Sequence, residues 1–131
     1  MRYLLDANVV IGLLNDARSK LARRARRERP ADIAISAIVA HELFYGAFRS
    51  GRASQNVALV DALQFTVIEF DKEDARHAGE VRALLASRGT PIGPYDVLIA
   101  GQAKARNLTL VTHNTDEFGR VPGLRLVDWH A

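Results

Sequence analysis

Residues 3–8 read Tyr3-Leu4-Leu5-Asp6-Ala7-Asn8, an apolar run that is followed at once by an acidic residue. Residues 2–5 predict a short buried strand. Asp6 and Asn8 favour a helix N-terminus, and we expect this helix to extend through Leu14. Because the strand passes directly into the helix, the Asp6 carboxylate should lie at the carboxyl end of the strand, where α/β proteins bind their ligands.

The alternation of strand and helix continues along the chain. The sequence predicts further strands at residues 33–35, 65–70, 108–112 and 124–127. It predicts helices at 37–48, 52–63, 71–87 and 94–106, a basic helix that ends at Pro30, and a loop or single helical turn at 114–118. This order indicates one α/β domain over residues 1–131, with a mostly parallel sheet between helical layers.

Composition excludes several classes of function. The chain has 131 residues and no cysteine, which excludes disulfides, thiolate zinc sites and cysteine nucleophiles. No apolar run approaches the ~20 residues of a membrane span, and Asp6 comes too early for a signal peptide, so we expect a cytoplasmic protein. Nucleotide-binding glycine motifs and a nucleophile elbow are absent, and no pair of histidines has the spacing of a zinc site.

Four carboxylates follow or lie within apolar segments, where an acid has little structural reason to be. They are Asp6, Glu42, Asp96 and Asp116. Asp6 and Asp116 each follow a predicted strand, and the carboxyl ends of parallel strands meet at one edge of a sheet. Glu42 and Asp96 lie in predicted helices among apolar residues. Converging carboxylates repel one another without a cation between them. The pattern therefore predicts a Mg²⁺ or Mn²⁺ site and phosphate chemistry.

Each acid taken alone also has a structural explanation. Asp6 is a good helix N-cap, and Asp96 lies in the first turn of a helix, where the helix dipole favours an acid. Asp116 and its neighbour Glu117 fall in a polar segment. Glu42 is the hardest to explain, because its neighbours on the same helix face are apolar. It is the four acids together that favour a metal site.

Basic residues gather between Arg18 and Arg29, where seven of twelve residues are Lys or Arg. Such a segment forms either a solvated amphipathic face or a surface that follows a phosphate backbone. We take Arg23, Arg24 and Arg27 as candidates for substrate binding.

Aromatic and histidine residues near the acids are weaker candidates. Tyr45 and Phe48 could stack on unpaired bases, although residues in an apolar helical stripe are more often part of the core. His41 and His113 adjoin acidic positions and could contact substrate, although a surface role is more common for such histidines.

Four segments carry the candidate residues, at 4–10, 35–47, 92–100 and 110–118. They read LLDANVV, ISAIVAHELFYGA, IGPYDVLIA and LVTHNTDEF. These segments resemble motifs of the PIN-domain ribonucleases, specifically the VapC-type toxins of bacterial toxin–antitoxin pairs. The ending from Val121 to Trp129 is also similar to that group. Together the motifs extend the resemblance over nearly the whole chain.

The resemblance implies a PIN-like three-layer α/β/α fold and a Mg²⁺- or Mn²⁺-dependent endoribonuclease that cuts structured RNA, often tRNA. It also implies a homodimer that forms a heterotetramer or larger assembly with a cognate VapB-type antitoxin, which occupies the active-site groove. Carried over residue by residue, it gives Asp6, Glu42 and Asp96 as the acidic core.

Two positions depart from the family pattern. Ala7 stands where many members have Thr, and Asn114 stands where many have an acid. The fourth acidic role then passes to Asp116, with Glu117 as the alternative. Asn114 is a candidate for holding substrate or a metal-bound water, and Asn8 is a further candidate for substrate binding.

The predicted reaction is metal-assisted hydrolysis of an RNA phosphodiester. Asp6 and Asp96 would bind the ion, and Glu42 and Asp116 would complete its surroundings. Two alternatives stay open. One is another Mg²⁺-dependent phosphohydrolase, which would usually have a second Asp at position 8, where Asn8 stands. The other is a non-enzymatic RNA-binding regulatory module whose acids only cap helices.

Overall fold

The computed structural model describes residues 1–131 and contains one five-stranded sheet. Its strands are β1 (Tyr3–Leu5), β2 (Ile33–Ser36), β3 (Thr66–Ile68), β4 (Thr109–Val111) and β5 (Leu126–Val127). The strand order is β3-β2-β1-β4-β5, and every neighbouring pair is parallel. The expected mostly parallel sheet is confirmed.

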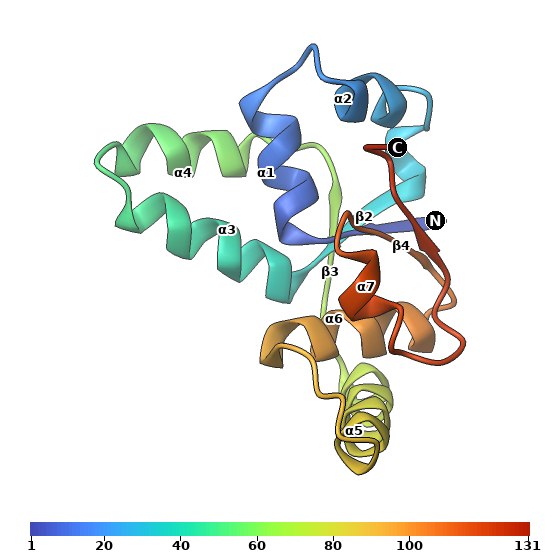
Figure 1. Cartoon of the computed structure of the whole chain (residues 1–131). Coiled ribbons are helices and arrows are strands. Elements are labelled where there is room, and N and C mark those ends of the chain that lie inside the picture. The colour runs from blue at the N-terminus through green and yellow to red at the C-terminus, as the bar shows by residue number, and fades with distance from the viewer.

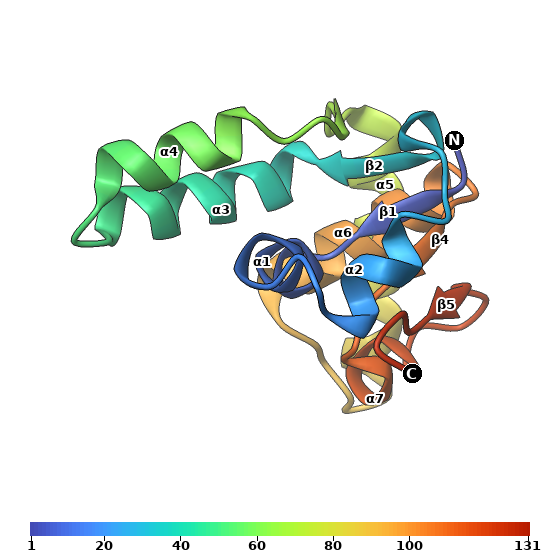
Figure 2. The ribbon, with the colours of Figure 1, turned by 90° about the horizontal axis from the view of Figure 1, so that it is seen from above.

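Helices cover both faces of this sheet. They are α1 (Ala7–Asn15), α2 (Lys20–Ala25), α3 (Ala37–Arg49), α4 (Ala53–Asp61), α5 (Lys72–Ser87), α6 (Pro94–Ala105) and α7 (Thr115–Phe118), with a 3₁₀ turn at Pro30–Asp32. Figures 1 and 2 show α5 and α6 on one face, α1 and α2 on the other, and the pair α3–α4 extending away from the sheet. The three-layer α/β/α fold is confirmed. None of the helices has the length and apolar character needed to cross a membrane.

The core centres on β1, the middle strand. Leu4 and Leu5 point to opposite faces of the sheet, as successive strand residues do, and both are completely buried. A parallel strand that is covered on both faces must be apolar throughout, which explains the run at residues 3–5. Burial of each leucine stabilises the fold by roughly 1.5–3 kcal/mol.

The layer formed by α5 and α6 depends on one very close contact. A Cβ atom added to Gly101 of α6 would lie 2.4 Å from the Cα atom of Ala78 in α5. Only glycine allows the two helix backbones to approach this closely. The contact fixes α6, and with it the first turn that carries Asp96.

The carboxyl edge of the sheet is where chain segments distant in sequence meet. The backbone N–H of Asp6, just after β1, donates to the carbonyl of Val111 at the end of β4. Thr112 follows β4 and its N–H donates to the carbonyl of Val127 at the end of β5. The segments after β1, β4 and β5 are thereby held side by side at this edge.

The basic helix is shorter than expected. α2 ends at Ala25, and turns and the 3₁₀ segment occupy the residues up to Asp32. Only Leu21 and Ala22 of α2 are buried. Beyond Ala25 the sequence is almost entirely charged, so it offers no apolar face whose packing would extend the helix.

Candidate active site

Asp6 is held in place by hydrogen bonds to both carboxylate oxygens. Oδ1 accepts the N–H of Val9 at 2.9 Å, as expected of an N-cap, and Oδ2 accepts the hydroxyl of Thr112. Asp6 is buried, and this burial raises the pKa of its carboxyl although both hydrogen bonds act in the opposite direction. An N-cap needs only one carboxylate oxygen. The hydrogen bond from Thr112 to the second oxygen therefore gives Asp6 a role beyond capping the helix.

Asp96 and Glu117 lie against each other beside Gly93. A Cβ atom added to Gly93 would be 3.2 Å from Oδ2 of Asp96 and 3.6 Å from Oε1 of Glu117. Burial raises the pKa of Asp96 to about 7, helped by a hydrogen bond to Glu117 and by the charges of Glu117, Glu42 and Asp6. Around neutral pH without a cation, a proton on Asp96 therefore bridges to Glu117.

Glu117 is the ionised partner in this pair. Its Oε1 accepts the N–H of Gly93 at 2.8 Å, and its Oε2 accepts the side-chain amide of Asn114 at 2.7 Å. The Gly93 amide is the largest of the influences that lower the pKa of Glu117. The side chain of Asn114, a candidate for holding substrate or a metal-bound water, orients this carboxylate.

Glu42 projects from α3 with one oxygen left without a partner. Its Oε1 is buried and makes no hydrogen bond. Burial raises the pKa of Glu42, and the negative charge of Asp6 raises it further, whereas His41 lowers it. A buried unpaired acceptor costs about 1–3 kcal/mol. Buried polar atoms of native folds are usually paired, so this oxygen has room in its surroundings for a water or an ion as partner.

We call the residues that meet here the acidic quartet: Asp6, Glu42, Asp96 and Glu117. No Lys, Arg or His side chain forms an ion pair with any of them. The quartet thus combines hard oxygen donors, mutual repulsion and an unpaired buried oxygen. This donor set fits a Mg²⁺ or Mn²⁺ ion, which prefers oxygen ligands.

Asp116 is not part of the quartet. Its side chain is exposed and makes no hydrogen bond or ion pair, whereas its neighbour Glu117 makes the contacts described above. Consecutive residues of a helix are about 100° apart around its axis, so the single turn of α7 directs only one of these two acids towards Asp96. The structure thus places Glu117, the alternative to Asp116, against Asp96, and Glu117 becomes our candidate for the fourth acid.

The candidate substrate-binding residues lie in different environments. Asn8 is exposed in the first turn of α1, where its backbone amide favours the ionised form of Asp6. Arg23 and Arg27 are exposed on and just after α2. Arg24 is less available to bind substrate than these two arginines. Its guanidinium donates to Glu28 at 2.9 Å and lies over the ring of Trp129 at 5.0 Å, so it holds the C-terminal segment in place.

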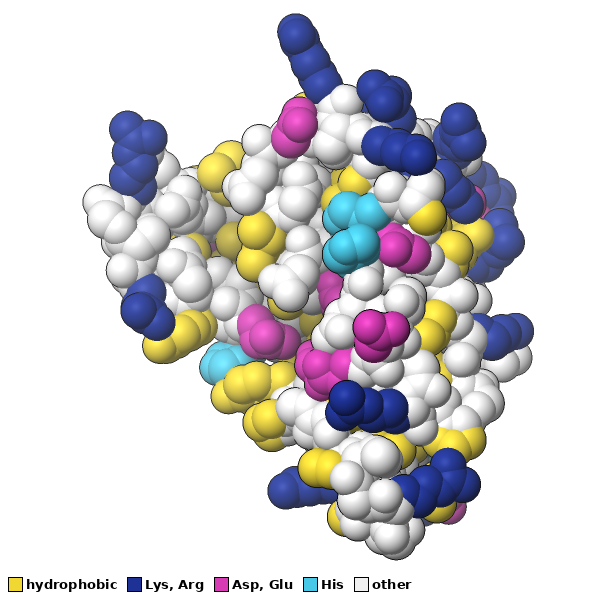
Figure 3. Space-filling model, viewed as in Figure 1, with side chains coloured by type: hydrophobic (Ala, Val, Ile, Leu, Met, Phe, Trp, Pro, Cys, Tyr) yellow, Lys and Arg dark blue, Asp and Glu magenta, His cyan; other side chains and the backbone are white.

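The distribution of charge on this face is uneven. Figure 3 shows acidic side chains gathered in the middle of the face, with most Lys and Arg side chains around the periphery and one next to the acids. An acidic centre within a basic rim suits a polyanion whose backbone is held by the rim and whose reacting phosphate reaches the centre.

Thr112, which orients Asp6, was not among the candidates from the sequence, although it lies within one of the four motifs and directly after a strand.

Comparison with known proteins agrees with this geometry. The family model described as PIN domain matches residues 3–124. The chain is 38% identical over 131 residues to the tRNA(fMet)-specific endonuclease VapC of Salmonella typhimurium and 37% identical to that of Shigella flexneri, with 98% of each chain covered. It is 31% identical to Ribonuclease VapC2 of Haemophilus influenzae, again with 98% of each covered.

Solved structures give the same result. The crystal structure of DNA-bound VapBC from Salmonella typhimurium contains a chain with a TM-score of 0.94 and 38% identity, with 98% of each chain covered. VapBC2 from Rickettsia felis, bound to a DNA fragment from its promoter, gives a TM-score of 0.90 and 35% identity, with 98% of this chain and 99% of that one covered. The chain therefore belongs to the PIN-domain family, and within it to the VapC ribonucleases of toxin–antitoxin systems.

Proposed function

We propose that this VapC-type ribonuclease hydrolyses RNA phosphodiesters with a divalent ion, Mg²⁺ or Mn²⁺, held by the acidic quartet. The observation that carries the proposal is the convergence of these carboxylates without a basic partner, together with the unpaired buried Oε1 of Glu42. A cation at this position would satisfy that oxygen and offset the burial and the neighbouring negative charges that raise the pKa of Asp96.

The protein supplies rigid carboxylates, and a bound ion would supply a Lewis acid. When bound, such an ion polarises a scissile phosphate and makes a water more acidic. Thr112 and the N–H of Val9 fix the orientation of Asp6, while Gly93 and Asn114 fix that of Glu117. Asp96 carries the proton that must leave before the quartet can bind a cation, so binding should release protons near neutral pH.

The substrate we propose is structured RNA, with tRNA as the first candidate. Two relatives with 38% and 37% identity are named tRNA(fMet)-specific endonucleases. Exposed Arg23 and Arg27 lie outside the acidic centre and can follow a phosphate backbone. Contacts of this kind give affinity and orientation without selecting a sequence.

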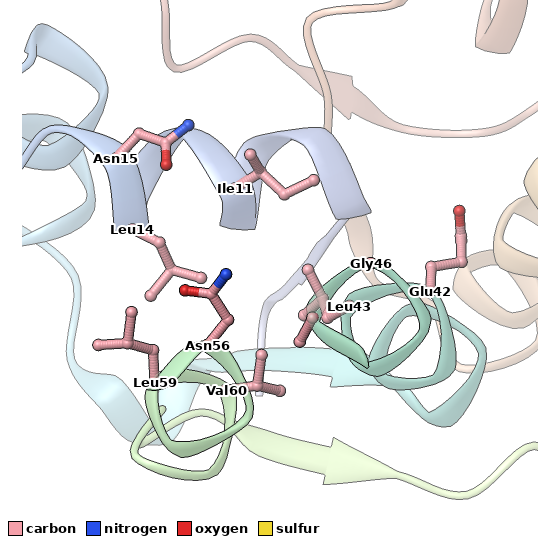
Figure 4. Close-up of a pocket in the computed structure, with 10 residues that line it drawn as sticks. Ile11, Leu14, Asn15, Glu42, Leu43, Gly46, Asn56, Leu59 and Val60 are labelled. Carbon is pink, nitrogen blue, oxygen red and sulfur yellow. The ribbon is translucent and has the colours of Figure 1, made fainter. Parts of the chain in front are cut away.

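The inhibitor we propose is a VapB-type antitoxin that docks in an apolar groove beside the quartet. Figure 4 shows the groove between α1, α3 and α4. Its lining includes Ile11, Leu14, Leu43 and Leu59, and Glu42 lies at one end. A helix with an apolar face would fill the groove, and an Arg on that helix could pair with the carboxylates.

Two aromatic side chains extend the apolar surface of α3. Tyr45 is 57% exposed and Phe48 is 67% exposed, so the interpretation of these residues as core is wrong. They are available to a protein partner, either the antitoxin or a second copy of the chain in the expected homodimer. The homodimer and the cytoplasmic location remain predictions.

The test is RNA cleavage by the purified chain after removal of any antitoxin. We expect cleavage in Mg²⁺ or Mn²⁺, no cleavage in EDTA, and loss of cleavage in Asp6→Asn and Asp96→Asn variants that keep the parent circular dichroism spectrum. Sequencing of RNA ends after brief expression would identify the cut site. Cleavage at the parent rate by either variant would remove that residue from the site. An absence of any cleavage together with tight RNA binding would favour the regulatory-module alternative.

A further inference from the structure

A second cluster of ligand atoms lies at the same edge of the sheet and contains no member of the acidic quartet. His113 follows β4, and Asp128 and His130 follow β5. The Nδ1 atom of His113 is 2.9 Å from Oδ2 of Asp128, and the Nδ1 atom of His130 is 3.1 Å from Oδ1 of the same carboxylate. We call these three residues the histidine cluster.

The spacing within the histidine cluster is that of ligands around a small ion. One ligand atom from each residue lies within 4.8 Å of the others. Two ligands that are each about 2.0–2.1 Å from a tetrahedral ion stand roughly 3.3 Å apart. The nitrogen–oxygen distances are close to this value, so small side-chain shifts would admit an ion between the three groups.

The backbone around the histidine cluster is already fixed. The N–H of Thr112 donates to the carbonyl of Val127, which joins the segment before His113 to the segment before Asp128. The N–H of His130 donates to Oδ1 of Asp128 at 2.9 Å. Ligands held by rigid elements lose little freedom on binding.

The ligands are also accessible and make no hydrogen bonds to side chains outside the cluster. The side chain of His113 is 71% exposed and that of His130 is 35% exposed. The only side-chain hydrogen-bond partner of each imidazole is Asp128, and the two rings pack against each other with centroids 4.6 Å apart. An ion would thus replace the protons between the imidazoles and the carboxylate without breaking a contact to the rest of the fold, and it would keep an open coordination position towards solvent.

We propose that His113, Asp128 and His130 form a site for a transition-metal dication such as Zn²⁺ or Ni²⁺. Imidazole nitrogen suits these ions, whereas Mg²⁺ and Mn²⁺ prefer the all-oxygen quartet. The proposal does not rest on the proposed nuclease function. Its ligands come only from the segments that follow β4 and β5, and a bound ion would tie the C-terminal segment to the end of β4.

The experiment is Ni²⁺ titration of the purified chain by calorimetry at pH 7.5, with Mg²⁺ in large excess to occupy the quartet. We expect about one Ni²⁺ per chain, as for a single set of ligands. His113→Ala and His130→Ala should each weaken Ni²⁺ binding at least about tenfold. Fluorescence of Trp129, the only tryptophan, should be quenched by Ni²⁺ in the parent and much less in these variants.

Control variants distinguish Ni²⁺ binding at the histidine cluster from nonspecific binding of Ni²⁺ to other histidines. His77→Ala removes a histidine of α5 outside the cluster and should bind Ni²⁺ as the parent does. Asp128→Asn keeps an acceptor for the N–H of His130, so it should fold while still weakening Ni²⁺ binding. The proposal is overturned if the parent binds no Ni²⁺ under these conditions, or if His113→Ala, His130→Ala and His77→Ala all retain the parent affinity.

Discussion

Replacing Asp96 by Asn should change how the stability of the metal-free protein depends on pH. The pKa of Asp96 is raised from 3.8 to about 7. Because the folded protein holds this proton more tightly than the unfolded chain, the carboxyl stabilises the fold fully below its unfolded pKa. It loses that contribution as the pH rises through its folded pKa.

The size of the effect follows from the separation of the two pKa values. At 1.36 kcal/mol for each pKa unit, a rise from 3.8 to about 7 corresponds to about 4 kcal/mol. Asp96 is only half-buried, and solvent screening reduces such a value, so we expect ~2 kcal/mol. In EDTA, the free energy of unfolding of the parent should therefore fall by ~2 kcal/mol more between pH 4 and pH 8 than that of Asp96→Asn.

The assay is urea unfolding of both proteins in EDTA at several pH values. The Asn amide can donate to Glu117 as the protonated Asp96 does, so the variant keeps the local contact and removes only the titration. Mn²⁺ should restore the stability of the parent at pH 8 and have a smaller effect on Asp96→Asn. Parallel curves of stability against pH for the two proteins would refute the reasoning.

Three further changes test separate parts of the structure. Glu117→Ala should lose more RNA cleavage than Asp116→Ala in a side-by-side assay; the reverse ranking would return the fourth acidic role to Asp116. Arg27→Glu should weaken RNA binding and reduce the salt slope of log K by about 1, and an unchanged slope in filter binding would exclude a phosphate contact. Gly101→Ala should destabilise the protein by about 1–3 kcal/mol or more in urea unfolding. In the control Gly79→Ala the new Cβ meets no atom within 4 Å, so this variant should be neutral or stabilised by up to about 1 kcal/mol. Equal stability of the two variants would contradict the tight α5–α6 contact.

Much of the fold could be predicted because local signals agreed with the packing. The run at residues 3–5 is apolar because β1 is buried on both faces, and its position before Asp6 places the acid at the carboxyl edge. The same logic placed the segment with Asp116, after the strand predicted at residues 108–112, at that edge. Glu42 and Asp96 could be predicted as inward-facing from their apolar surroundings, and the structure brings both towards Asp6.

What could not be predicted depended on rotation and on distant contacts. Asp116 and Glu117 are adjacent acids, and only the orientation of α7 decides which of them meets Asp96. The histidine cluster was missed because its members are brought together by the parallel pairing of β4 and β5, whereas sequence reasoning considered local zinc-type spacing. The separation of 15 residues between His113 and Asp128 carries no such signal.

The most direct test of the acidic quartet as a metal site is the Mn²⁺ dissociation constant of the parent and of Glu42→Gln at pH 8. The substitution keeps the size of the side chain and removes the charge from the oxygen that lacks a partner. We expect Glu42→Gln to bind Mn²⁺ at least about tenfold more weakly, with the same circular dichroism spectrum as the parent. Equal Mn²⁺ dissociation constants for the two proteins would contradict the assignment of these carboxylates to a metal site.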